Sequence, residues 1–283
     1  MPNRIFSSLV VLLWMGSMTA LFVRDVWPAW TAQDLPPVCS ADVFDGIDRN
    51  QQYGMFVGAG GRIGTSWTRF RSITDVQTIE MTHFIERIGD FGPIRIETDL
   101  RFSADQGRLE EFSVRLHGAP QPIQIEGERI GDEIVCNIHA GTTRRAFHVN
   151  AAVAGMIGES LRPFSVLPDI HVGQTWRVYM LDPLSLLLGG KTAPRPLLVR
   201  VTGRETITIR GTPTEMFVVE WPSSRSWVDD RGRVIRTQID VPLIGRLTVL
   251  AEPFSDSDLR AARARVPIIY NSAARRKTIG GDS

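Results

Sequence analysis

Few residues could carry out chemistry, and most of them lie in strand or turn patterns. Nucleophilic catalysis needs a Cys or Ser beside a positioned base. Cys136 in EIVCNIH, with His148 further along, is the best candidate pair. Apolar and polar residues alternate around Cys136, which favours a small buried core residue, and no Gly-x-Ser-x-Gly motif occurs. We therefore predict no catalytic residue, with an undetected envelope hydrolase as the alternative.

Two further patterns imitate ligand sites. GAGGRIG at 58–64 is glycine-rich like a phosphate loop. A phosphate loop joins a strand to a helix, whereas this segment joins two alternating runs, so we interpret it as a hairpin turn. ADQG at 104–107 and VDDRG at 228–232 resemble general acid–base pairs. Asp is favoured in such turns for backbone reasons, however.

The histidines lack the close spacing of a metal-binding motif. They are His83, His117, His139, His148 and His171. We predict neither a metal nor a cofactor. The net charge of +1 gives no general field that attracts nucleic acid, so no nucleic-acid partner is expected either.

The first residues predict a membrane anchor. Residues 5–23 run without a charge, which is long enough to cross a bilayer as a helix. Trp27 and Trp30 follow at the position of an interfacial belt. A cleaved signal peptide is the alternative, and whether the segment is cleaved stays open. With residues 1–4 in the cytoplasm, the main domain would lie outside the cytoplasm, in the periplasm, on a single-pass protein of the cell membrane.

Composition and residue pattern divide the remaining chain into a juxtamembrane linker at 24–44, a β-rich domain at 45–254, and a basic, partly disordered tail at 255–283. Cys39 in the linker and Cys136 in the domain form a possible disulfide, because an oxidising compartment permits one. Two unrelated thiols, one of them buried, are the alternative.

Alternation of apolar and polar residues at period two predicts half-buried antiparallel strands. It occurs at 94–102, 109–116, 122–130, 195–203 and 234–241. Helical patterns are scarce, with candidates at 149–162 and in DSDLRAARARV. GTSW at 64–67 resembles GQTW at 173–176, and DQGRL at 105–109 resembles DRGRV at 230–234. We expect a mainly β fold with a curved antiparallel sheet, either a half-barrel or a duplicated meander, and one or two short helices.

Residues 166–185 combine a turn, a strand and a helix start. TWRVYM at 175–180 alternates as a strand does, and Asp182-Pro183 is typical of a helix N-terminus. The helix that follows has no polar face, so it is either a core helix or an apolar surface for a ligand or partner. The possible contact residues are Leu184, Leu186, Leu187, Leu188 and Trp176.

Three motifs in order resemble a known region. They are YGMFVGAGGRIGTSW at 53–67, LPDIHVGQTWRVYMLDPLSL at 167–186 and SWVDDRGRVIRTQID at 226–240. Together they resemble the β-rich extracytoplasmic region that precedes the catalytic core in some bacterial transglutaminase-like proteins. The resemblance implies a curved β-sheet, distantly similar to the half-barrels of lipoprotein carriers, and no known activity. A catalytic core would have to follow, and only about thirty residues remain.

We therefore expect a membrane-anchored binding or accessory protein without catalytic activity. It would engage an envelope protein or an apolar ligand. A carrier of lipid or lipoprotein is an alternative. An accessory to a transglutaminase-like enzyme is another.

Overall fold

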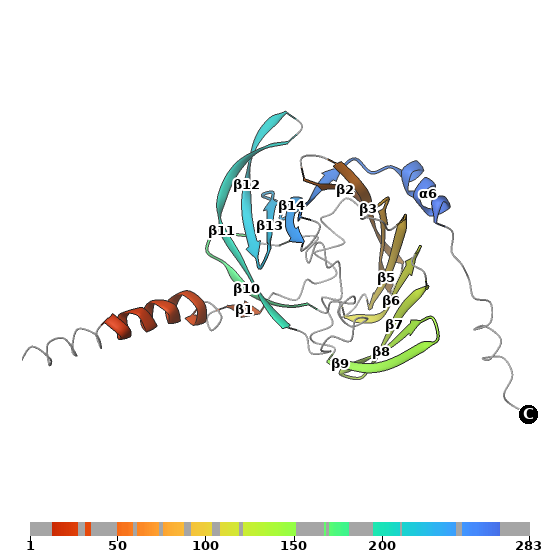
Figure 1. Cartoon of the computed structure of the whole chain (residues 1–283), viewed down its shortest axis with the longest axis horizontal. Coiled ribbons are helices and arrows are strands. Elements are labelled where there is room, and N and C mark those ends of the chain that lie inside the picture. Colours follow the sequence, from red (N-terminus) through yellow and green to blue (C-terminus); the bar gives the residue numbers. More distant parts are fainter. Residues whose placement is uncertain are drawn as a thin grey trace, which may run out of the picture.

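The strands form one strongly curved sheet (Figure 1). The computed structural model describes residues 13–27, 32–34, 50–58, 61–73, 76–87, 92–103, 108–118, 121–150, 167, 170–180, 195–209, 211–241 and 245–266. Within them the sheet has 15 strands in the order β1-β10-β11-β12-β13-β14-β15-β2-β3-β4-β5-β6-β7-β8-β9. The predicted curved antiparallel sheet is confirmed.

Two meanders make up this sheet. The first contains β2 (Asn50–Val57), β3 (Gly61–Ile73), β4 (Val76–Ile85), β5 (Ile94–Ser103), β6 (Leu109–His117), β7 (Ile123–Ile130), β8 (Glu133–Ala140) and β9 (Thr143–Asn150). The second contains β10 (Thr175–Met180), β11 (Arg195–Ile209), β12 (Thr212–Trp221), β13 (Ser224–Val228), β14 (Val234–Val241) and β15 (Gly245–Glu252). Antiparallel pairing of β15 with β2 joins them, and β1 (Gln33–Asp34) pairs in parallel with β10.

The strands form where the sequence alternates, because alternate side chains then lie on the two faces of the sheet. All five alternating segments are strands, and so is 175–180. The inner face carries the buried apolar set. In the first meander it includes Met81, Leu100, Phe112, Ile125 and Cys136. In the second meander it includes Trp176, Val199, Val219, Val228 and Val234.

The repeated tetrapeptides do not occupy equivalent places. GTSW lies within β3, and its Trp67 packs on the outer face against the helix α6 (Asp256–Arg265). GQTW leads into β10, and its Trp176 packs in the inner cluster. The two meanders also differ in length, with eight strands in one and six in the other within the described residues. The tetrapeptides therefore do not mark a structural duplication.

One helix, α6 (Asp256–Arg265), covers part of the outer face (Figure 1). Ser255 caps its N-terminus by accepting a hydrogen bond from the Asp258 amide at 3.2 Å. Leu259 is buried against Trp67 of β3 and Phe84 of β4. The predicted DSDLRAARARV helix is confirmed, and it packs on the sheet although the sequence boundary placed it in the tail.

The N-terminal helix lies away from the sheet (Figure 1). Residues 13–21 are α-helical and continue into the π-helical turn η1 (Phe22–Val26). In the part of the chain that the structure describes, no helix combines the length and apolar character needed to span a membrane. The predicted tail 1–4 and residues 5–12 of the predicted anchor 5–23 lie outside that part, as does 151–162 of the helix candidate at 149–162.

Candidate functional site

Of the predicted apolar contact residues, the structure describes only Trp176. Trp176 lies in β10 and is only 3% exposed, packed in the inner cluster with Val199 and Val219. It is thus packed in the core among the described residues, and its role as a contact residue stays a prediction. Leu184, Leu186, Leu187 and Leu188 lie outside the described residues, so the apolar helix stays a prediction.

Cys136 is a free thiol at the centre of the first meander. It is completely buried on the inner face of β8, and burial raises its pKa to about 11. A thiol of this kind is protonated at neutral pH and is a poor nucleophile. Cys39 lies outside the described residues, so the disulfide between Cys39 and Cys136 is not tested.

Cys136 and His148 lie on opposite faces of the sheet. Cys136 is directly opposite Phe147 in the β8–β9 register, whereas His148 is opposite Val135. Since neighbouring residues of a strand point to opposite faces, the thiol points inward and the imidazole outward. His148 is exposed and contacts Glu133 at 2.8 Å. A thiol–imidazole dyad is therefore not formed between these two residues.

The acidic run VDDRG forms a tight turn. One carboxylate oxygen of Asp229 accepts hydrogen bonds from the amides of Arg231 and Arg233 at 3.0 and 2.8 Å. Gly232 has a φ of +78°, and its carbonyl accepts from the amide of Leu167 at 2.9 Å. This confirms the turn interpretation and shows that the motifs at 167–186 and 226–240 contact each other. The run ADQG lies outside the described residues.

The other sequence candidates are also placed. In GAGGRIG, Gly58 follows β2 at a φ of +60° and residues 61–64 open β3, which pairs antiparallel with β2; residues 59–60 lie outside the described residues. Among the described residues, no group of three or more His, Cys, Asp or Glu side chains is arranged to hold a metal ion. His83 is buried on the inner face of β4, and His117 is buried on the outer face of β6.

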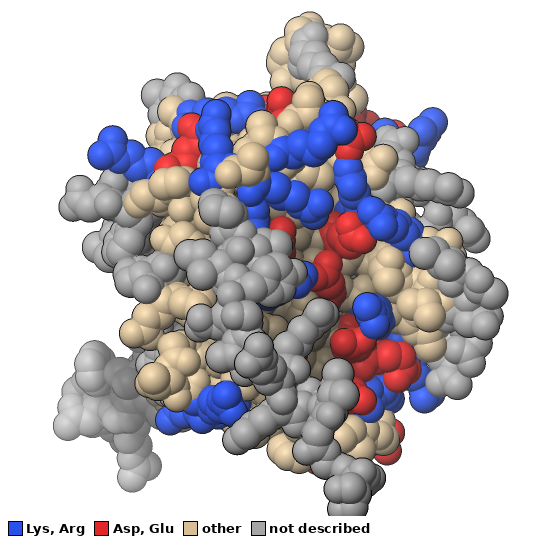
Figure 2. Space-filling view, turned by 90° about the vertical axis from the view of Figure 1, so that its right-hand side faces the viewer, with Lys and Arg blue, Asp and Glu red and all other residues tan. Residues whose placement is uncertain are grey.

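The outer face of β4–β7 carries acidic side chains that sequence reasoning did not bring together. We call it the acidic surface, and it consists of Glu80, Asp99, Glu111, Glu126 and Glu128. Glu80 lies directly opposite Asp99, and Glu111 lies directly opposite Glu128. Like charges in opposite positions of a sheet are destabilising. Figure 2 shows acidic side chains gathered on this side of the molecule, below a band of basic ones.

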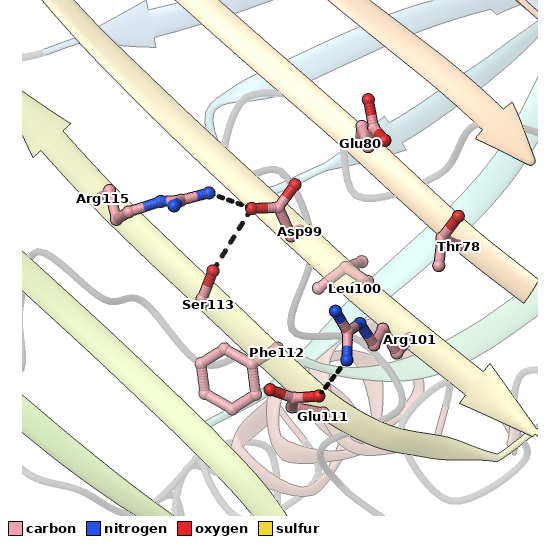
Figure 3. A pocket seen from close by; sticks show the side chains of 9 residues that line it. All are labelled: Thr78, Glu80, Asp99, Leu100, Arg101, Glu111, Phe112, Ser113 and Arg115. Carbon is pink, nitrogen blue, oxygen red and sulfur yellow. Dashed lines mark hydrogen bonds and ion pairs between the residues drawn. The ribbon is translucent and has the colours of Figure 1, made fainter. Parts of the chain in front are cut away.

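A pocket of about 330 Å³ opens within the acidic surface (Figure 3). Arginines cross it. Arg115 donates to Asp99, which also accepts from the Ser113 hydroxyl at 3.4 Å. Arg101 donates to Glu111 at 2.8 Å. The pocket therefore has a lining of paired opposite charges, in contrast to the apolar inner face.

Part of the acidic surface is not neutralised. Arg71 pairs with Glu80 at 3.3 Å, so three of the five carboxylates have an arginine partner. Within the described residues, no ion pair neutralises Glu126 or Glu128, which are exposed on β7. The segment IEGERI gave only a strand signal in the sequence. The strand register decides which carboxylates become neighbours, and the sequence pattern alone does not give that register.

Comparisons with known proteins give no family. No family model matches this sequence, and no curated protein matches it. One similar solved structure is a β-barrel-like protein of the domain of unknown function DUF1849 from Brucella abortus. It is 8% identical, with a TM-score of 0.38 over 72% of this chain and 95% of that one. Another is a DUF1089 family protein from Pseudomonas aeruginosa, 17% identical, with a TM-score of 0.33 over 63% of this chain and 90% of that one.

Proposed function

We propose that this chain is a membrane-tethered binding protein that docks a cationic segment of a partner protein on the acidic surface of β4–β7. The observation that carries the proposal is the like-charge pair of Glu111 and Glu128 beside a pocket. An antiparallel sheet ordinarily has one polar face in solvent, so polarity alone would not indicate a partner. Glu80 and Asp99 also lie opposite each other, but arginines neutralise both of them. Glu128 has no ion-pair partner among the described residues, so a bound cation would stabilise its position opposite Glu111.

The charge pattern of the surface agrees with a polypeptide partner. Charged groups arranged in complementary pattern give specificity and speed the encounter more than they add affinity. Arg101 and Arg115 each donate a hydrogen bond to one carboxylate of the pocket. The pocket therefore contains both charges, and two of its carboxylates are held in place. Glu126, which accepts a hydrogen bond from Gln124 at 2.6 Å, and Glu128 have no ion-pair partner among the described residues, so they are the groups that meet the partner's charge.

The N-terminal helix supports the membrane tether. Nine large apolar side chains of residues 13–27 are between 36% and 69% exposed in the structure. They are Leu13, Trp14, Met15, Met18, Leu21, Phe22, Val23, Val26 and Trp27. A helix that is apolar on all sides needs an apolar environment. We propose that lipid provides it, with the β domain on the extracytoplasmic side as the sequence predicts.

The alternative functions predicted from the sequence, an apolar-ligand site or a lipid carrier, depend on apolar residues and not on the acidic surface. An apolar ligand or lipid carrier needs accessible apolar side chains, and the inner-face clusters described here are buried. The candidate leucines at 184–188 lie outside the described residues. The acidic surface is exposed and contains the pocket, so we propose it ahead of an apolar site.

The docking proposal is tested with a labelled oligoarginine peptide as the probe. The full chain in detergent is titrated at several salt concentrations, and binding is followed by fluorescence anisotropy. Exposed ion pairs contribute about 0.2–1 kcal/mol each, so the double variant Glu126→Gln with Glu128→Gln should bind about threefold to tenfold more weakly. Glu215→Gln is the matched control, since Glu215 is equally exposed on the distant β12. Wild-type affinity in the double variant would contradict the proposal.

The tether is tested separately by a fusion. Alkaline phosphatase placed after Ser283 should be active, and the fusion should stay in the membrane fraction after a high-salt wash. An inactive fusion would place the β domain in the cytoplasm and would leave the docking result unaffected.

A further inference from the structure

A second site lies beneath α6, beside the acidic surface. Eleven buried side-chain nitrogen or oxygen atoms of the described residues lack a hydrogen-bond partner. Five of them gather in one place and are all nitrogens: Arg95 Nε, Arg95 Nη2, Arg115 Nε, His117 Nε2 and Arg263 Nε. Guanidinium nitrogens only donate, so each one that is buried without an acceptor has lost its hydrogen bonds to water and gained none in return. Such a concentration therefore marks a place where acceptors are missing.

One carboxylate stands among these nitrogens. Glu97 Oε1 is 3.5 Å from Arg95 Nε and 3.7 Å from Arg263 Nε, and Glu97 Oε2 is 3.5 Å from His117 Nε2. These separations are longer than charged hydrogen bonds, which are about 2.7–2.9 Å. Glu97 thus lies within ion-pair range of three basic groups without satisfying any of the three nitrogens.

The charges do not balance either. Arg95 is 1% exposed and faces Glu97, as does Arg263 from the helix. Arg115 has Asp99 as its own partner. Two guanidinium groups therefore share a single carboxylate. Water could accept from the free N–H groups, but it would leave the excess positive charge in a desolvated place. A negatively charged acceptor would accept hydrogen bonds from these N–H groups and would also neutralise the excess positive charge.

The free edge of Arg95 has the right geometry for such an acceptor. Its Nη1 already donates to the Arg263 carbonyl of α6 at 2.6 Å, which fixes the guanidinium. Nε and Nη2 donate no hydrogen bond, although Glu97 Oε1 lies 3.5 Å from Nε, and they form the side-on fork that binds two oxygens of a carboxylate or phosphate together. The side chains of Arg115 and Arg263 are 31% and 41% exposed, so two members of the cluster reach solvent.

We propose that the fork of Arg95, with Arg263 and His117 beside it, binds an oxyanion: a phosphate or carboxylate group. The bound group accepts from Arg95 Nε and Nη2 and neutralises the second guanidinium. Because α6 supplies Arg263 and the carbonyl that holds Arg95, the anion also fastens α6 to β5. The proposal does not depend on the acidic surface or on its partner.

The test uses inorganic phosphate and acetate as probes on the full chain in detergent. Thermal unfolding is measured at pH 7.5 and constant ionic strength, with chloride as the balancing ion, and affinity is measured by calorimetry. We expect a saturable rise in melting temperature with phosphate, with acetate, or with both, at one site per chain. The salt that raises the melting temperature, phosphate or acetate, shows which chemical group binds. A rise that only follows ionic strength in every salt would overturn the proposal.

Variants decide where the ion binds. Arg263→Gln should weaken binding at least tenfold, because it removes a charge facing the site. Arg265→Gln is the matched control on the same helix, since Arg265 is 62% exposed and pairs with Glu86 instead, and it should bind as the wild type does. Arg95→Lys keeps the charge but removes the fork, and it should abolish binding. Wild-type affinity in Arg263→Gln would refute the site even if the Arg95 variant does not fold.

Discussion

Substituting Gly232 by Ala tests how the turn 229–233 is held against the preceding motif. Gly232 has a φ of +78°, and a methyl group on it would overlap the backbone carbonyl of Leu167. Gly211 offers a matched control. Its φ is +85°, and nothing lies within 4 Å of the position of an added methyl group. Both substitutions place Ala in the left-handed region, but only the methyl group of Gly232→Ala would overlap backbone atoms.

The magnitudes follow from this difference. An L-residue in the left-handed region costs about 1–2 kcal/mol, and restricting the unfolded chain returns about 0.4–1 kcal/mol. Gly211→Ala should therefore lower the free energy of unfolding by about 1 kcal/mol. Gly232→Ala has the same cost and must also displace Leu167, which is 1% exposed. Overpacking of this kind adds about 1–3 kcal/mol.

The assay is thermal unfolding of both variants in the same detergent. Since 1 kcal/mol shifts the melting temperature of a domain of this size by about 2–4 °C, Gly211→Ala should lose about that amount. Gly232→Ala should lose at least twice as much. Equal losses would show that the contact between Gly232 and Leu167 does not constrain the turn, and the link between the two motifs would then carry no stability.

Three further results are expected. Burial and the nearby Arg95 lower the pKa of His117 below its ordinary 6.5, so the free energy of unfolding should fall as the pH drops below 6.5, and His117→Gln should flatten that slope. Cys136, with a pKa of about 11, should resist a thiol reagent at pH 8 until denaturant is added; rapid native labelling would contradict its burial. Leu259→Ala should cost about 2–5 kcal/mol, while exposed Arg260→Ala should cost little in the same melts.

The sequence was sufficient to predict the strands whose pattern is local. Apolar and polar residues largely alternate in Ile94–Ser103 and Val234–Val241, and each segment is a strand with buried residues. The turn at Asp229 was also predictable, because its carboxylate bonds amides two and four residues onward. Information of this kind is contained in a few consecutive residues.

The pairing of the two meanders was not predictable in the same way. Leu247 of β15 lies opposite Val57 of β2, and no local pattern links these distant segments. A shift of one residue in any register would exchange the two faces. The acidic surface depends on such registers, as does the position of α6 over Trp67. Sequence reasoning therefore identified the elements but could not assemble the candidate site.

The two proposed sites meet at Arg115. On the outer face of β6, Arg115 donates to Asp99 in the pocket, while its buried Nε faces the cluster beneath α6 without a partner. An oxyanion that attracts this guanidinium would weaken its hold on Asp99 and leave that carboxylate to a cationic partner. By thermodynamic reciprocity, a partner bound at Asp99 would then strengthen oxyanion binding by the same factor. The geometry thus predicts that the two ligands, if both bind, assist each other.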